Sequence, residues 1–92
     1  MYYVYILRCS DDSLYIGYTA NLEARLKGHN MGLGAAHTHK RLPVKLVYSE
    51  PHPTRLAAVR RERQLKGWSR EKKEALIRGD FASLCVLSKR RT

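Results

Sequence analysis

Three short stretches of the chain are rich in aromatic, β-branched and aliphatic residues, and this pattern predicts β-strands. The first stretch covers residues 2 to 9 and the second covers Leu14 to Tyr18, with a polar turn from Ser10 to Ser13 between them. Two such strands joined by a short polar turn are typical of a β-hairpin. A third strand is predicted over Val44 to Tyr48, with Val44, Leu46 and Tyr48 alternating against Lys45 and Val47.

The register of the hairpin decides which side chains share a face. A two-residue loop would pair Arg8 with Tyr15 and place Tyr5 and Tyr15 on opposite faces. A three-residue loop pairs Leu7 with Tyr15 and Tyr5 with Gly17. It collects Val4, Ile6 and Ile16 on one face and Tyr3, Tyr5 and Tyr15 on the other. We predict this second register, which requires a left-handed residue near Asp12, a conformation that Asp tolerates.

Three helices are predicted from their capping residues. Asn21, Thr54 and Ser69 are good N-caps, and helices are expected after them over about residues 22–30, 55–66 and 70–78. Residues 31–43 carry two glycines and no clear period, which indicates a loop rich in hydrogen-bond donors. Pro51-His52-Pro53 is expected to break the chain. These elements predict one α+β domain over residues 1–80, with a three-stranded antiparallel sheet. The tail over residues 81–92 is expected to be partly docked on the core and frayed from Ser88 onward.

The composition indicates a polyanionic partner. The 92 residues suffice for a single small domain. A formal charge of +10, from 18 Lys and Arg against 8 Asp and Glu, favours nucleic acid first and an anionic membrane second. The chain has neither an apolar run of about 20 residues nor a convincing amphipathic basic helix, which argues against a membrane. Its first residues lack the features of a signal peptide, so we expect a cytoplasmic protein whose Cys9 and Cys85 are reduced thiols.

Three groups of residues could carry chemistry, and each also has a purely structural interpretation. Glu62 lies among arginines on the side of its helix that Ala58 and Leu65 direct toward the sheet, so it could form an ion pair or hold Mg²⁺. Arg25 and His29 lie four residues apart on one helix face. They could contact phosphate and transfer protons, or they could form a solvated face. The tyrosines could equally be strand residues packed in a sheet.

The order and spacing of these residues are more specific than any one of them. Tyr3-Val4-Tyr5 is followed by Tyr15-Ile16-Gly17 and then by Arg25, His29 and the distant Glu62. This arrangement resembles the GIY-YIG nuclease superfamily, and above all its small single-domain bacterial members, the UPF0213 group. The resemblance runs from about Tyr2 to Ile77. It includes Tyr18-Thr19-Ala20-Asn21-Leu22, His29-Asn30, Pro43-Val44-Lys45-Leu46-Val47-Tyr48 and Arg61-Glu62.

The resemblance implies a fold in which three helices flank the sheet, and it implies a metal-dependent nuclease. Residue by residue, it places catalytic roles on Tyr5, Tyr15, Arg25, His29 and Glu62, with Glu62 as the ligand of Mg²⁺ or another divalent cation such as Mn²⁺. Tyr5 would orient or deprotonate the attacking water in the field of Arg25, His29 and the metal, and Arg25 would bind the phosphorane. Two departures stand out: Tyr3 and Val4 replace the Gly and Ile of the first family motif, and the chain has no appended DNA-recognition domain.

We expect the protein to bind nucleic acid, with DNA favoured over RNA. Binding should show weak sequence specificity, and its affinity should depend steeply on salt concentration. A role in DNA repair or processing, a monomeric state and no obligate protein partner are expected. The predicted contacts are Gly17, Lys40, Arg41, Arg55, Arg60, Arg61, Arg63 and Lys66.

Three alternatives remain open at this stage. The protein could be a non-catalytic module whose tyrosines stack on bases, or an adaptor that recruits a larger DNA-processing complex. A zinc site built from His37, His39 and a cysteine is a further alternative, although the sequence offers no evident fourth ligand.

Overall fold

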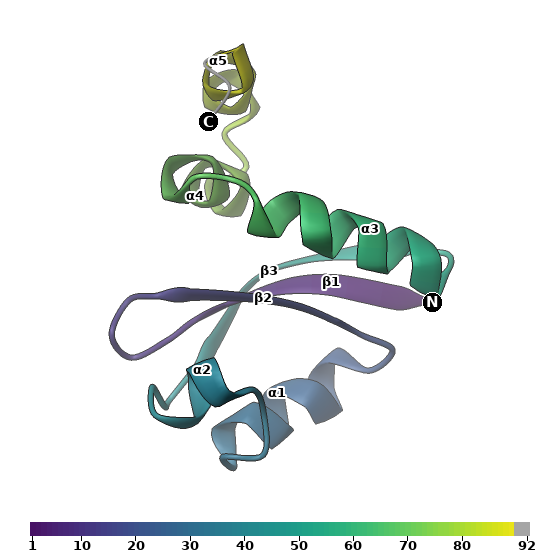
Figure 1. Cartoon of the computed structure of the whole chain (residues 1–92), viewed down its shortest axis with the longest axis vertical. Coiled ribbons are helices and arrows are strands. Elements are labelled where there is room, and N and C mark those ends of the chain that lie inside the picture. The colour runs from purple at the N-terminus through teal and green to yellow at the C-terminus, as the bar shows by residue number, and fades with distance from the viewer. Residues whose placement is uncertain (90–92) are drawn as a thin grey trace.

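A three-stranded antiparallel sheet lies at the centre of the protein, and helices cover both of its faces (Figure 1). The computed structural model describes residues 1–89, and residues 90–92 lie outside it. Strand β1 (Tyr2–Arg8) lies between β2 (Leu14–Thr19) and β3 (Lys45–His52). Helices α1 (Leu22–Asn30) and α2 (Ala36–His39) lie on one face of the sheet, and α3 (Arg55–Lys66) lies on the other. Helices α4 (Arg70–Arg78) and α5 (Phe81–Lys89) follow beyond the end of the sheet.

The predicted register of the hairpin is confirmed. Tyr5 pairs with Gly17 and Leu7 pairs with Tyr15. The turn contains the predicted left-handed residue, because Asp12 has a φ of 69°. Tyr5 and Tyr15 therefore lie on the same face of the sheet.

Strand β3 is longer than the sequence predicts. It begins at Lys45 and continues through Pro51 to His52, so the expected break at residues 51–53 is wrong for its first two residues. A proline is tolerated here because β3 is an edge strand, where a missing N–H need not interrupt a ladder. A register shift between Ile6 and Leu7 also breaks the predicted alternation, so that Val47 and Tyr48 both pack against the core on the α3 side.

The three predicted helices are confirmed with their caps. The side chains of Asn21, Thr54 and Ser69 each accept a hydrogen bond from the backbone N–H three residues later. Gly79 ends α4 in the left-handed conformation, with a φ of 70°. Two further helices occur where none was predicted. The short α2 lies in the expected loop, and α5 covers the expected tail as far as Lys89. The predicted fraying is therefore wrong for Ser88 and Lys89, and the rest of that prediction falls on residues 90–92, outside the described residues.

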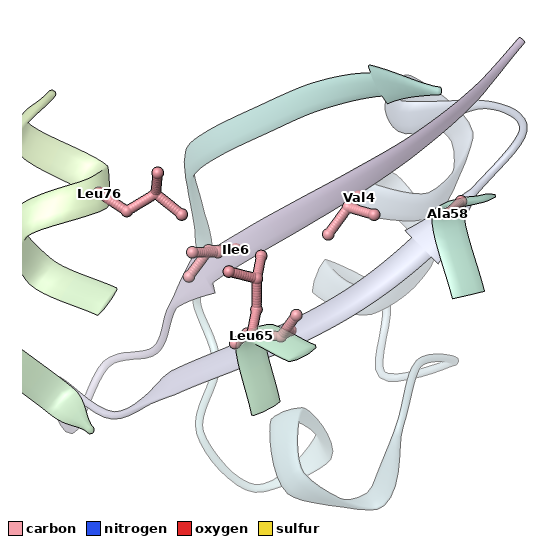
Figure 2. Close-up of a cluster of buried hydrophobic side chains, with 6 residues drawn as sticks. Val4, Ile6, Ala58, Leu65 and Leu76 are labelled. Carbon is pink, nitrogen blue, oxygen red and sulfur yellow. The ribbon is translucent and has the colours of Figure 1, made fainter. Parts of the chain in front are cut away.

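The larger hydrophobic core joins α3 and α4 to the sheet. Val4 and Ile6 project from β1 toward Ala58 and Leu65 of α3 and Leu76 of α4 (Figure 2). Val4, Ile6, Ala58 and Leu65 are fully buried. This face of the sheet carries the aliphatic residues that the predicted register collects on one side, with Ile16 completing the cluster.

A second cluster lies under α1 on the opposite face. Tyr5, Leu7, Cys9 and Val44 are its buried members, and Tyr15, Leu22, Leu26 and Leu42 pack around them. Cys9 is a buried free thiol, and Cys85 is an exposed free thiol on α5. Tyr5 and Tyr15 thus lie in the cluster beneath α1, on the opposite face of the hairpin from Val4, Ile6 and Ile16.

An ion network ties the hairpin to α4. Arg8 donates two hydrogen bonds to the Glu74 carboxylate, at 2.6 and 2.9 Å, and a third to Asp12 at 3.0 Å. Arg70 donates to both carboxylates from the other side. The hydrogen bonds from Arg8 lower the pKa of Glu74 to about 2. The turn containing the left-handed Asp12 is therefore held against a distant helix.

Within residues 1–89, no helix has the length and apolar character needed to cross a bilayer.

Candidate active site

The Tyr5 hydroxyl is the centre of the candidate site. Tyr5 is 2% exposed, and its hydroxyl oxygen accepts a hydrogen bond from Nε of Arg25 at 3.3 Å. Nε2 of His29 lies 3.2 Å from the same oxygen. Helix α1 supplies both partners because Arg25 and His29 are one helical turn apart. The phenol is therefore held between a guanidinium and an imidazole.

Gly17 makes this arrangement possible. A Cβ atom at residue 17 would lie 2.5 Å from the Tyr5 hydroxyl oxygen and 2.7 Å from Cζ of the same ring. Gly17 is itself buried in β2, directly across from Tyr5. We therefore assign Gly17 to the packing of Tyr5 rather than to contact with nucleic acid.

Tyr15 lies at the centre of a group of four rings. Its ring centroid is 6.4 Å from that of Tyr5, 5.3 Å from that of His29 and 6.2 Å from that of His37. The His37 ring is stacked, with an interplanar angle of 24°. Nε2 of His37 lies 3.0 Å from Oγ of Ser13, which donates to Asp11. The structure thus places His37 beside the predicted catalytic tyrosine.

Burial determines how Tyr5 and His29 ionise. Burial raises the pKa of the Tyr5 phenol, and this effect outweighs the lowering by the hydrogen bond and charge of Arg25. Burial also lowers the pKa of His29, and the Arg25 charge lowers it further. Arg25 lowers the pKa of Tyr5, as the predicted field requires, but this lowering is smaller than the effect of burial. His29, whose pKa is lowered, adds no positive charge to the field at pH 7. Neutral His29 is instead able to accept a proton from Tyr5.

The lowered pKa of His29 predicts a pH dependence of stability. The unfolded chain binds a proton at His29 more readily than the folded chain, so stability should fall as the pH drops below the ordinary pKa of 6.5. One such group contributes at most about 1.4 kcal/mol per pH unit. We expect His29→Phe to flatten the curve of unfolding free energy between pH 7 and pH 5. Denaturant titrations of both proteins measure this difference, and equal slopes would refute it.

Glu62 belongs to α3, which lies on the opposite face of the sheet from α1. Its side chain is 15% exposed, and its carboxylate is 3.5 Å from Nζ of Lys66. The Glu62 charge contributes to the raised pKa of Tyr5, which puts the two groups within reach of each other's field. Within residues 1–89, Glu62 shares no hydrogen bond with the residues around Tyr5. The structure thus brings Tyr5, Tyr15, Arg25 and His29 together and sets Glu62 apart from them.

The donor set around Glu62 fits a cation that is completed by substrate. No group of three or more His, Cys, Asp or Glu side chains within residues 1–89 could hold a metal ion. A single carboxylate still suits Mg²⁺, which keeps several waters and often takes its remaining ligands from substrate phosphates. The contacts of His37 and His39 disfavour the zinc alternative. His37 contacts Ser13, and Nδ1 of His39 lies 3.0 Å from the carbonyl oxygen of Gly32.

The predicted nucleic-acid contacts divide into two groups. Lys40, Arg55, Arg60, Arg63 and Lys66 are exposed. Arg55 lies over the Tyr18 ring, with its guanidinium carbon 6.0 Å from the ring centroid. Arg41 and Arg61 are half-buried and already have partners inside the protein. Arg41 binds Asp11 and the carbonyl of His37, while Arg61 binds Glu50 and lies over the Trp68 ring. The exposed group is therefore the available cationic surface.

Sequence reasoning missed Thr38 and Gly34, which surround His29. Oγ1 of Thr38 lies 2.7 Å from Nδ1 of His29, and both residues are fully buried. A Cβ atom at residue 34 would overlap Nδ1 of His29. The only signal in the sequence was the density of Gly and polar residues in the segment from 31 to 43, which indicated a functional loop without identifying a residue.

Comparison with known proteins shows the family of the chain. The sequence profile described as the GIY-YIG catalytic domain matches residues 1–75. A UPF0213 protein of Haloquadratum walsbyi is 52% identical over 75 residues, which covers 82% of this chain and 84% of that protein. A UPF0213 protein of Staphylococcus haemolyticus is 50% identical over 76 residues, which covers 83% of this chain and 93% of that protein.

Two solved structures are similar to the chain. The solution NMR structure of a UPF0213 protein from Bacillus halodurans has 45% sequence identity and a TM-score of 0.54, and the match covers 84% of this chain and 83% of that one. A protein from E. faecalis, also solved by solution NMR, has 36% identity and a TM-score of 0.59, with coverage of 88% and 86%. The match of sequence and fold shows that this chain belongs to the GIY-YIG family and, within it, to the UPF0213 proteins.

Proposed function

We propose that the protein is a metal-dependent nuclease that hydrolyses phosphodiester bonds, with DNA favoured over RNA. The observation that carries this proposal is the Tyr5 hydroxyl, held 3.3 Å from Nε of Arg25 and 3.2 Å from Nε2 of His29. A guanidinium is suited to a phosphate oxygen, and a neutral imidazole is suited to accept a proton. The match to a GIY-YIG catalytic domain supports the same chemistry.

Tyr5 and His29 would activate the attacking water together. As the water oxygen attacks phosphorus, its proton passes to the Tyr5 oxygen, and the Tyr5 proton passes to Nε2 of His29. The raised pKa of Tyr5 keeps the phenol protonated until this transfer, so the neutral imidazole is required as the final acceptor. The bond between phosphorus and the leaving oxygen then breaks.

Arg25 would stabilise the phosphate during this step. Its side chain is exposed, and its Nε donates a hydrogen bond to the Tyr5 hydroxyl at 3.3 Å. A substrate phosphate that binds Arg25 therefore lies next to the phenol. The fixed positive charge stabilises the negative charge that develops on the phosphorane oxygens.

Glu62 would hold Mg²⁺ or Mn²⁺ together with a substrate phosphate and waters. The bound cation would supply neutralising charge for the phosphate and the leaving oxygen. Lys66 is the only cation paired with this carboxylate within residues 1–89, and the 3.5 Å separation is long.

The exposed cations of α3 would bind the nucleic-acid backbone. Arg60 and Arg63 are exposed and have no ion-pair partner within residues 1–89, and Arg55 extends the same helix toward β2 through Tyr18. Such contacts neutralise phosphates without reading bases. Weak sequence specificity follows from this kind of surface, as does an affinity that decreases steeply with salt.

Cleavage of defined oligonucleotides tests the proposal. Duplex, single-stranded and branched DNA and RNA are incubated with highly purified protein in Mg²⁺ or in chelator. We expect Mg²⁺-dependent shortening by the wild type, and we expect Glu62→Gln in Mg²⁺ to match the wild type in chelator. Glu71→Gln on α4 is the matched control, because Glu71 is an exposed carboxylate of the same size, and it should cleave like the wild type.

The remaining outcomes identify the alternatives. Oligonucleotide binding without shortening, with or without Mg²⁺, would contradict the proposal and favour a non-catalytic binding module. Little affinity for any oligonucleotide would favour an adaptor that binds an acidic protein partner.

A further inference from the structure

The two ring nitrogens of His29 have different partners, and the direction of each hydrogen bond decides what the ring can do. Nε2 faces the Tyr5 hydroxyl at 3.2 Å, and Nδ1 faces the Thr38 hydroxyl at 2.7 Å. Thr38 in turn lies 3.0 Å from the carbonyl oxygen of Ala35 and donates to it. A neutral imidazole carries one proton, so only one of its nitrogens is a donor.

A count of donors and acceptors identifies the nitrogen that carries the proton. Arg25 donates its Nε proton to the Tyr5 oxygen, so the Tyr5 proton needs an acceptor of its own. Within residues 1–89 the only acceptor near that hydroxyl is Nε2 of His29. Nε2 must then be unprotonated, which puts the imidazole proton on Nδ1. Nδ1 donates to the Thr38 oxygen, whose own proton goes to Ala35.

The opposite arrangement leaves a buried donor unsatisfied. If Thr38 donated to Nδ1, the proton on Nε2 would point at the Tyr5 oxygen together with the proton from Arg25. The Tyr5 proton would then have no acceptor within the described residues, although Tyr5 is only 2% exposed. A buried unsatisfied hydroxyl costs about 1–3 kcal/mol. In the first arrangement, each hydrogen bond in the series Arg25, Tyr5, His29, Thr38 and Ala35 has one donor and one acceptor.

We propose that Thr38 is a positioning residue that fixes His29 in the Nδ1–H tautomer and thereby keeps Nε2 free to accept the Tyr5 proton. Thr38 lies on α2, and its hydroxyl is the link between that helix and the ring. The effect of Thr38 on catalysis rests on the proposed nuclease function. The effect of Thr38 on the tautomer of His29 does not depend on that function.

The surroundings of His29 make this hydroxyl difficult to replace. His29 and Thr38 are both fully buried, which limits the access of water that could substitute for the threonine. The backbone of Gly34 approaches the Nδ1 side of the ring so closely that a Cβ atom there would overlap it. The ring is therefore confined on that side.

Nuclear magnetic resonance of the full chain tests the tautomer directly. Long-range ¹H–¹⁵N correlations of the imidazole ring at pH 7.5 or above show which nitrogen of His29 carries the proton. We expect the pattern of an Nδ1–H imidazole in the wild type. A spectrum showing the proton on Nε2 would overturn the proposal, whatever the cleavage assay shows.

Two substitutions of Thr38 separate its hydroxyl from its shape. Thr38→Ser keeps the acceptor and should retain the Nδ1–H pattern and most of the activity. Thr38→Val keeps the size but removes the acceptor, so we expect a mixture of tautomers and cleavage lowered by about 10- to 100-fold. A Val variant with an unchanged Nδ1–H spectrum would overturn the proposal.

If the Val variant does not fold, the wild-type spectrum still decides the tautomer. If the wild type shows the Nδ1–H pattern but cleaves nothing, the nuclease function fails and the role of Thr38 in the tautomer stands.

Discussion

Replacing Tyr5 with Phe should lower the rate of Mg²⁺-dependent cleavage about 10³-fold, within the range typical of a lost general acid or base. The hydroxyl lies within hydrogen-bond distance of both Arg25 and His29, so its removal breaks the path from water to imidazole. His29 also loses its donor at a buried position, which should destabilise the protein by about 1–3 kcal/mol. Single-turnover cleavage with saturating enzyme measures the chemical step, and denaturant unfolding measures the stability.

Tyr3→Phe is the matched control for this substitution. Tyr3 lies two residues earlier on β1, on the same face, and its hydroxyl makes no hydrogen bond within the described part of the chain. Its loss should leave the cleavage rate within about twofold of the wild type, as expected of a surface change away from the site. Equal rates for wild type and Tyr5→Phe would exclude the phenol from the reaction.

The second large effect is expected from Gly17→Ala. The new methyl group would lie 2.5 Å from the Tyr5 hydroxyl oxygen and 3.2 Å from a carbon of the Tyr15 ring, so the phenol must move. A displacement of about 1 Å at a reacting group can cost about 10²-fold in rate. Overpacking should also cost about 1–3 kcal/mol of stability. Cleavage and denaturant unfolding of the purified variant measure both effects.

Gly28→Ala should not show the losses of cleavage rate and stability that are expected of Gly17→Ala. Gly28 lies inside α1, and a Cβ atom there would meet nothing within 4 Å. Alanine should therefore stabilise the helix by about 0.5–1 kcal/mol and leave cleavage unchanged. If Gly17→Ala behaved like Gly28→Ala, the close fit between residue 17 and the Tyr5 ring would be incorrect.

The hairpin and its faces could be predicted because few residues allow an alternative. Of the two registers considered, only one puts Tyr5 and Tyr15 on the same face while placing Gly17 across from the phenol. Side-chain caps identified the starts of α1, α3 and α4 for a similar reason, because each cap acts on a backbone group three residues away. Local chemistry was sufficient for these elements.

Tertiary contacts explain what the sequence could not predict. The edge position of β3 tolerates Pro51, and the short α2 has no side-chain N-cap and no period to reveal it. The role of Thr38 depends on its distance to His29, nine residues earlier in the chain, which no local pattern encodes. The charge state of His29 follows from its burial and could not be inferred from its place on α1 beside Arg25.

Because the side chains of β1 alternate between two faces, one strand contributes separately to the stability of the core and to the reactivity of the candidate site. These two properties are often difficult to change independently. Val4 and Ile6 point into the core beneath α3, while Tyr5 and Leu7 point toward α1 and the candidate site. A combinatorial library restricted to positions 4 and 6 would therefore change the stability of the core with little direct effect on the phenol. A second library at odd positions of the same strand would explore reactivity. One strand thus offers an engineer two nearly orthogonal sets of positions.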